Sequence, residues 1–89
     1  MISRTTRKFR ECLQNLPPEI REQARNAYKL FSQDPNHPGL QFKKVHTKQE
    51  IFAARISLDY RALCIRNGDT LIWFWVGKHT EYERVLKTL

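Results

Sequence analysis

The sequence of 89 residues predicts an α+β fold in which a helical hairpin precedes a mainly antiparallel sheet. Apolar residues recur at helical spacing in the first third of the chain, and a turn-rich segment over residues 34–39 ends this pattern. Beyond it, β-branched and aromatic residues follow at strand-like intervals. We expect one domain over residues 1–89, with four strands and a short C-terminal helix.

The helical hairpin is predicted from two apolar stripes separated by Pro17 and Pro18. Thr5 or Thr6 is available to cap the first helix, and the proline pair ends it. The same prolines suit the opening turn of the second helix, which we expect to end near Asp34. The stripes consist of Phe9, Leu13 and Leu16 in the first helix and Ile20, Ala24, Ala27, Tyr28 and Phe31 in the second.

Four strands are predicted over residues 40–46, 51–58, 60–66 and 70–76. Residues 67–69 read Asn-Gly-Asp, which favours a tight hairpin turn between the last two strands. The last strand is apolar without alternation, so we expect it in the middle of the sheet, with Trp73 and Trp75 in the core. In the second strand the period of two places Phe52, Ala54, Ile56 and Leu58 on one face and Arg55 and Ser57 on the other.

The C-terminal helix is predicted from a capping box over residues 80–83, with Thr80 as the N-cap. An apolar stripe supports it, formed by Tyr82, Val85, Leu86 and Leu89. His79 would then lie just before the N-cap, where the helix dipole and free amides favour an anion.

The charge of the chain indicates a polyanionic partner. The net charge is +7, with 16 Lys and Arg against nine Asp and Glu, and the basic residues are spread along the chain. Such a surface is attracted to nucleic acid because phosphate contacts release counterions. Cys12 and Cys64 fit neither a disulfide framework nor a zinc site, which favours a reducing cytoplasm. We see no membrane-spanning run and no signal peptide, and we expect no membrane partner.

Three segments resemble the RelE/ParE toxin superfamily. They are residues 76–82 at the junction of the last strand and the last helix, 40–45 after the hairpin, and 54–61 with its two arginines. The resemblance covers nearly the whole chain and implies a RelE-like fold and the toxin of a type II toxin–antitoxin system. Family members divide into ribosome-dependent messenger RNA endonucleases and gyrase poisons. The Gly77-to-His79 element is similar to that of YafQ-like endonucleases, which favours the nuclease branch.

The catalytic residues that we predict are His79, Arg61 and Arg55. RNA can be cut by its own 2′-hydroxyl, which asks for proton transfer and charge stabilisation and no metal. An imidazole transfers protons near neutrality, and guanidinium groups offer paired donors to a phosphate. The acidic residues show no tight grouping of the kind that a two-metal nuclease needs. We therefore expect no cofactor and no metal, with the division into acid and base left open.

Residues expected to bind RNA lie on either side of these three. Lys43 and Lys44 point to opposite faces of a strand, so only one should meet RNA, and we favour Lys44. His46 would share its face, and Glu50 is an alternative base. Tyr82 either anchors the core or stacks on a base. The remaining RNA-binding candidate is Lys78.

The partners implied by the resemblance are a cognate antitoxin, in a toxin–antitoxin hetero-oligomer, and messenger RNA on the ribosome. Two other functions stay open. One alternative to the nuclease is a ParE-like inhibitor of DNA gyrase that binds without catalysis. The other is a decayed, non-toxic nucleic-acid-binding module.

Overall fold

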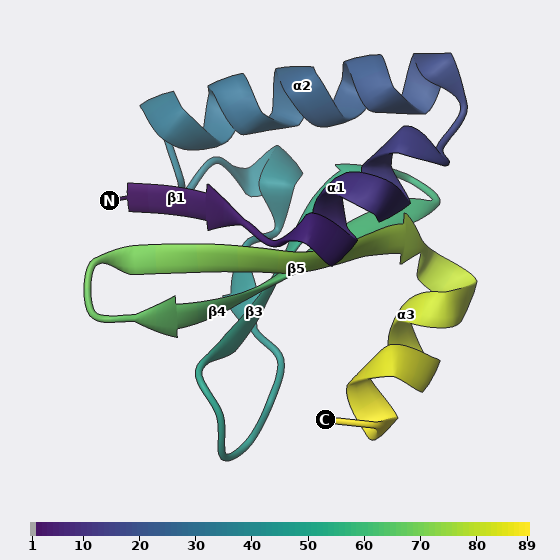
Figure 1. The fold of residues 1–89 in the computed structure, drawn as a ribbon. Coiled ribbons are helices and arrows are strands. Elements are labelled where there is room, and N and C mark those ends of the chain that lie inside the picture. The colour runs from purple at the N-terminus through teal and green to yellow at the C-terminus, as the bar shows by residue number, and fades with distance from the viewer. Residues whose placement is uncertain (1) are drawn as a thin grey trace.

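The computed structural model describes residues 2–89 and places two helices on one face of a five-stranded sheet and a third helix on the other (Figure 1). Met1 lies outside the described residues. The elements are β1 (Ile2–Thr5), α1 (Arg7–Gln14), α2 (Pro18–Gln33), the 3-10 turn η1 (Pro38–Leu40), β2 (Lys43–Lys44), β3 (Ile51–Ser57), β4 (Tyr60–Asn67), β5 (Thr70–Lys78) and α3 (His79–Lys87). Within residues 2–89, no helix has the length and apolarity needed to cross a bilayer.

The sheet has the strand order β1-β5-β4-β3-β2. β1 runs parallel to β5, whereas the other neighbouring pairs are antiparallel. The α+β prediction and the mainly antiparallel sheet are confirmed, but the sheet has five strands where we expected four. β1 could not be predicted from the sequence because this short edge strand is mostly exposed and carries no alternation of apolar residues.

The strand predicted over residues 40–46 is largely wrong. Residues 38–40 form a 3-10 turn with Leu40 buried, and Gln41 adopts a left-handed backbone conformation with φ 46°. This conformation interrupts an extended chain, so only Lys43 and Lys44 join the ladder with β3. The other strands begin at the expected residues, although Leu58 leaves the predicted face and is exposed in the turn after β3.

Two of the three helices begin and end as the sequence predicts. The Thr6 hydroxyl oxygen accepts a hydrogen bond from the Phe9 amide at 3.1 Å and caps α1, and α2 begins at Pro18. The capping box predicted for α3 is not used: the helix begins at His79 with Lys78 as N-cap, and no side chain caps it. Instead, the His79 amide donates to the Asp59 carbonyl at 2.6 Å. A tertiary bond thus satisfies the first amide of α3.

The two faces of the sheet carry separate apolar clusters. The cluster under α1 and α2 includes Phe31 and Trp73, and the cluster beside α3 includes Leu63 and Trp75. Both tryptophans are buried, at 7% and 8% exposure, as predicted. They face opposite sides because the register between β4 and β5 shifts by one residue: Leu63 pairs with Trp75, but Cys64 pairs with Trp73. A β-bulge of this kind reverses the alternation of side chains.

Burial of Cys64 generates the first prediction. Its side chain has no exposed surface, and loss of solvation raises the pKa of its thiol from 9.0 to about 12. Because the unfolded thiol loses its proton first, the free energy of unfolding should fall as the pH rises from 9 toward 12. We expect iodoacetamide at pH 9 to alkylate the half-buried Cys12 and to spare Cys64 until urea unfolds the chain, as measured by mass spectrometry of digested protein. Equal rates for both thiols in native protein would contradict this burial.

Candidate functional site

The Arg61 side chain is fixed over the turn between β3 and β4. Its Nη1 atom donates toward the carbonyl oxygens of Ser57 at 2.8 Å, Tyr60 at 3.0 Å and Leu58 at 3.2 Å. Within residues 2–89 its Nε and Nη2 atoms have no hydrogen-bond acceptor. One nitrogen therefore anchors the guanidinium, while the rest of its donor fork is available to a ligand.

His79 is held at the same turn. Its backbone amide bonds to the carbonyl of Asp59, between the residues that anchor Arg61. The exposed imidazole stacks on the Tyr82 ring, with centroids 5.9 Å apart and planes 23° from parallel. Tyr82 in turn interacts electrostatically with Arg61. The structure thus brings His79, Arg61 and Tyr82 to one corner of the molecule, where β5 ends and α3 begins (Figure 1).

Across the sheet at this corner, Arg55, Arg61 and Gly77 are cross-strand neighbours on β3, β4 and β5. Partial burial lowers the pKa of the Arg61 guanidinium, and the positive charge of Arg55 lowers it further. Burial raises the pKa of the Tyr82 phenol, and Arg61 opposes that rise. Two cations side by side with a protonated phenol form a local site for an anion.

Gly77, which belongs to this row, makes room for the indole of Trp75 on the same strand. A Cβ atom at Gly77 would lie 2.6 Å from Cζ2 of Trp75, which is closer than real contacts allow. The indole of Trp75 therefore lies across the position where a side chain of residue 77 would stand. The sequence marked Gly77 only through the family resemblance, and the packing gives its physical reason.

The two lysines of β2 lie on different faces, as their spacing predicted. Lys43 pairs across the ladder with Ala53 and Lys44 with Phe52. Since Ala53 belongs to the cluster beside α3 and Phe52 packs in the other, Lys43 shares the face of Arg61. The register therefore places Lys43, and not the favoured Lys44, toward the corner of Arg61.

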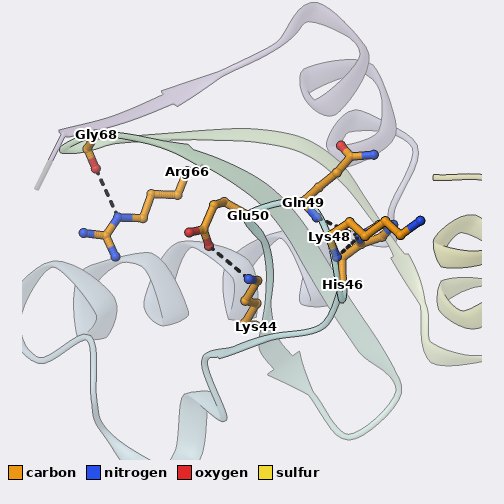
Figure 2. A network of polar contacts seen from close by, with 7 residues as sticks. All are labelled: Lys44, His46, Lys48, Gln49, Glu50, Arg66 and Gly68. Carbon is orange, nitrogen blue, oxygen red and sulfur yellow. Dashed lines mark hydrogen bonds and ion pairs between the residues drawn. The ribbon is translucent and has the colours of Figure 1, made fainter.

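Lys44, His46 and Glu50 instead belong to a polar network around the loop before β3 (Figure 2). The Lys44 ammonium pairs with the Glu50 carboxylate at 3.6 Å. The Nδ1 atom of His46 accepts hydrogen bonds from the amides of Lys48 at 3.1 Å and Gln49 at 2.9 Å. His46 thus lies outside β2 and holds a loop, so the strand period that linked it to Lys44 does not apply.

The remaining candidates differ in how closely they approach the corner. Tyr82 is half-buried against the apolar cluster beside α3, so it packs on the core while part of its ring stays exposed. Lys78 is exposed at the end of β5 and pairs across the ladder with Tyr60. No group of three His, Cys, Asp or Glu side chains with metal-binding proximity occurs within residues 2–89.

The sequence did not reveal the role of the turn over residues 57–60, whose backbone carbonyls anchor Arg61 and His79. Three of these carbonyls receive Arg61, and that of Asp59 receives His79. The signal in the sequence was limited to Asp59, a residue common in turns, between two strands. Carbonyl groups leave no trace in side-chain patterns, so their role was visible only in the structure.

Solved structures that resemble this chain include toxins. The chain resembles RelE in the RelB–RelE antitoxin–toxin complex from Methanococcus jannaschii, at 21% identity and a TM-score of 0.69 over 92% of this chain and 96% of that one. It resembles YafQ from E. coli at 9% identity and a TM-score of 0.70, over 90% of this chain and 94% of that one. It resembles a chain of the RelBE2 toxin–antitoxin complex from Mycobacterium tuberculosis at 24% identity and a TM-score of 0.67, over 88% of this chain and 96% of that one. No curated protein sequence is significantly similar to the chain.

The family match and the fold place the chain in the RelE/ParE toxin superfamily, as the sequence predicted. Residues 18–84 match the ParE-like toxin domain, and the chain belongs to that family. The matched segment begins at α2 and ends within α3, so it includes Arg55, Arg61 and His79.

The contact at Gly77 generates the second prediction. Gly77→Ala should destabilise the fold by about 1–3 kcal/mol because the new methyl group forces the Trp75 indole to move. Urea unfolding followed by circular dichroism measures the loss. In a Trp75→Leu background the same substitution should cost less, since the clashing ring is gone. An equal cost in both backgrounds would show that the indole is not the obstacle.

Proposed function

We propose that this chain is an endoribonuclease toxin that cleaves messenger RNA on the ribosome without a metal. The observation that carries the proposal is the common anchoring of His79 and Arg61 to the turn over residues 57–60. A proton-transfer group and a phosphate-binding group thereby lie at one corner. Had they lain on opposite sides of the sheet, no transesterification site could be built from them.

In the proposed reaction the RNA 2′-hydroxyl attacks the adjacent phosphorus, and the bond from phosphorus to the 5′-oxygen breaks. The attacking hydroxyl loses a proton and the leaving oxygen gains one, and His79 carries one of these transfers. The free donors of Arg61, with the charge of Arg55, stabilise the negative charge that grows on the phosphate oxygens. The Tyr82 phenol, whose pKa burial raises above its usual value, is protonated near neutral pH and can donate a hydrogen bond.

The RNA path that we propose runs over the face of the sheet beside α3. Lys43 lies on this face next to the row of Arg55 and Arg61, and Lys78 lies at the end of β5. Lys44 and His46 lie near its edge, in the network of Figure 2, where Lys44 pairs with Glu50. The net charge of +7 draws the protein to ribosomal RNA as well as to the message.

We also propose that a cognate antitoxin binds and silences this chain. Similar structures were determined as RelB–RelE complexes from Methanococcus jannaschii and Pyrococcus horikoshii. With 16 basic and nine acidic residues, the chain favours an acidic partner. Such a complex would be a toxin–antitoxin hetero-oligomer in the cytoplasm.

A gyrase-binding toxin is the second candidate, because the matching family is described as ParE-like. His79→Ala separates the two. In a nuclease this substitution should lower the RNA cleavage rate by about 10²–10⁴-fold and abolish growth arrest, because proton transfer is lost. Primer extension on transcripts from cells that express the toxin measures cleavage. His37→Ala, in the exposed loop after α2, is the matched control and should leave cleavage intact.

Growth arrest that persists in His79→Ala cells with uncut transcripts would contradict the nuclease and support gyrase binding. Normal growth with the unaltered protein at good expression levels would remove both toxin functions and leave the non-toxic binding module.

Arg61 holds the turn and, in this proposal, also binds the phosphate, which generates a further prediction. Arg61→Lys keeps the charge, but a single ammonium group cannot hold the turn carbonyls and also offer a fork to a phosphate. We expect cleavage to fall by about 10²–10³-fold, the size of losing one charge-stabilising donor. Cleavage assays in a reconstituted translation system measure this, and Lys29→Arg on α2 is a control. A rate within twofold of the unaltered enzyme would show that charge alone suffices.

A further inference from the structure

A cleft of about 360 Å³ lies between the helical hairpin and the sheet. Its walls are mostly apolar and include Leu13 of α1, Ala24 and Phe31 of α2, Ala54 of β3 and Trp73 of β5. α1 packs on β5 and α2 on β3, which leaves this space over the strand between them. The volume falls within the range of about 300–1,000 Å³ that is typical of small-molecule sites.

The charged residues that line the cleft are all arginines. Arg21 and Arg25 of α2 line it, and no Asp or Glu of residues 2–89 does so. Arg55 of β3 also borders it, but its side chain lies on the opposite face of the sheet, with Arg61. Arg21 is fixed, because its Nη1 donates to the carbonyls of Gln14 at 3.1 Å and Leu16 at 3.0 Å. Arg25 is exposed at the rim, where its Nη2 atom pairs with the Glu22 carboxylate at 2.8 Å. The cleft thus combines an apolar interior with positive charge at its edge.

This cleft is separate from the site of Arg61 and His79. It is lined by Trp73, whose cluster lies under α1 and α2, whereas Trp75 belongs to the cluster beside α3. In Figure 1 the hairpin and α3 lie on opposite sides of the sheet. A ligand in the cleft would therefore leave the corner of His79 open.

We propose that the cleft binds a small amphipathic anion, with an apolar chain between the hairpin and the sheet and a carboxylate among the arginines. A polar anion alone would leave the apolar walls uncovered. An apolar cation would be repelled by Arg21, whose charge no ion pair within residues 2–89 balances. The proposal is independent of the nuclease assignment.

Decanoate is the probe, and the two tryptophans report on the two faces. In ¹⁵N-labelled protein, decanoate should shift the indole N–H resonance of Trp73 saturably, with a Kd on the order of 1 mM, and leave that of Trp75 in place. Decyltrimethylammonium, which has the same chain and the opposite charge, should not shift either one below its micelle concentration.

Matched variants locate the site. Ala24→Leu should weaken binding by about fivefold or more because its side chain fills the cleft, whereas Gln23→Leu, an exposed neighbour on α2 outside the cleft, should not. Arg25→Gln should weaken binding about threefold, and Lys29→Gln, with the same change of charge outside the cleft, should leave it unchanged. An unmoved Trp75 resonance shows that each variant is folded.

Three results would overturn the proposal: no shift of Trp73 below the micelle concentration, equal shifts of both indoles, or equal binding of the cationic probe. His79→Ala should bind decanoate as the unaltered protein does. A loss of RNA cleavage and a loss of decanoate binding are therefore distinguishable failures.

Discussion

The one-residue shift of register between β4 and β5 is the constraint on which the arrangement depends. Leu63 pairs with Trp75, but Cys64 pairs with Trp73. Two tryptophans that are two residues apart, and would share one face of a regular strand, therefore lie on opposite faces of the sheet. Each is the large anchor of its own cluster, one under the hairpin and one beside α3. A regular ladder would place both indoles on one face and leave the other without its aromatic anchor. The bulge thus allows a chain of 89 residues to cover both faces of its sheet.

Placement of the site follows from that arrangement. Trp75, directed toward the α3 side, lies over Gly77, the cross-strand partner of Arg61, and its indole fills the place of a side chain there. β5 ends at Lys78, and the amide of the next residue, His79, donates to the carbonyl of Asp59. The turn over residues 57–60 thereby holds the Arg61 guanidinium through three of its carbonyls and the start of α3 through the fourth. Backbone carbonyls of a tight turn hold their positions better than side chains do, which suits a site that must aim two groups at one phosphate.

The sequence predicted those parts of the fold that depend on side-chain pattern. The hairpin follows from apolar spacing and the Pro17–Pro18 pair, and the β4–β5 hairpin from Asn67-Gly68-Asp69, where Gly68 has φ 62°. Features set by backbone geometry escaped it. Gln41 in a left-handed conformation shortened β2, a tertiary carbonyl replaced the capping box of α3, and exposed β1 carried no apolar signal. For the same reason the sequence named Arg61 and His79 but could not tell which of Lys43 and Lys44 shares the face of Arg61, since that depends on register with β3.

Arg55 adds a second positive charge to the corner of Arg61. It is the cross-strand partner of Arg61, and Arg55 lowers the pKa of the Arg61 guanidinium after partial burial has done so. Its charge is not matched by any ion pair within residues 2–89, because the ion pairs there involve Arg7, Arg25 and Lys44. An anion bound between the two guanidinium groups would relieve their mutual repulsion. The placement of two unmatched cations on neighbouring strands therefore favours an anion at this corner.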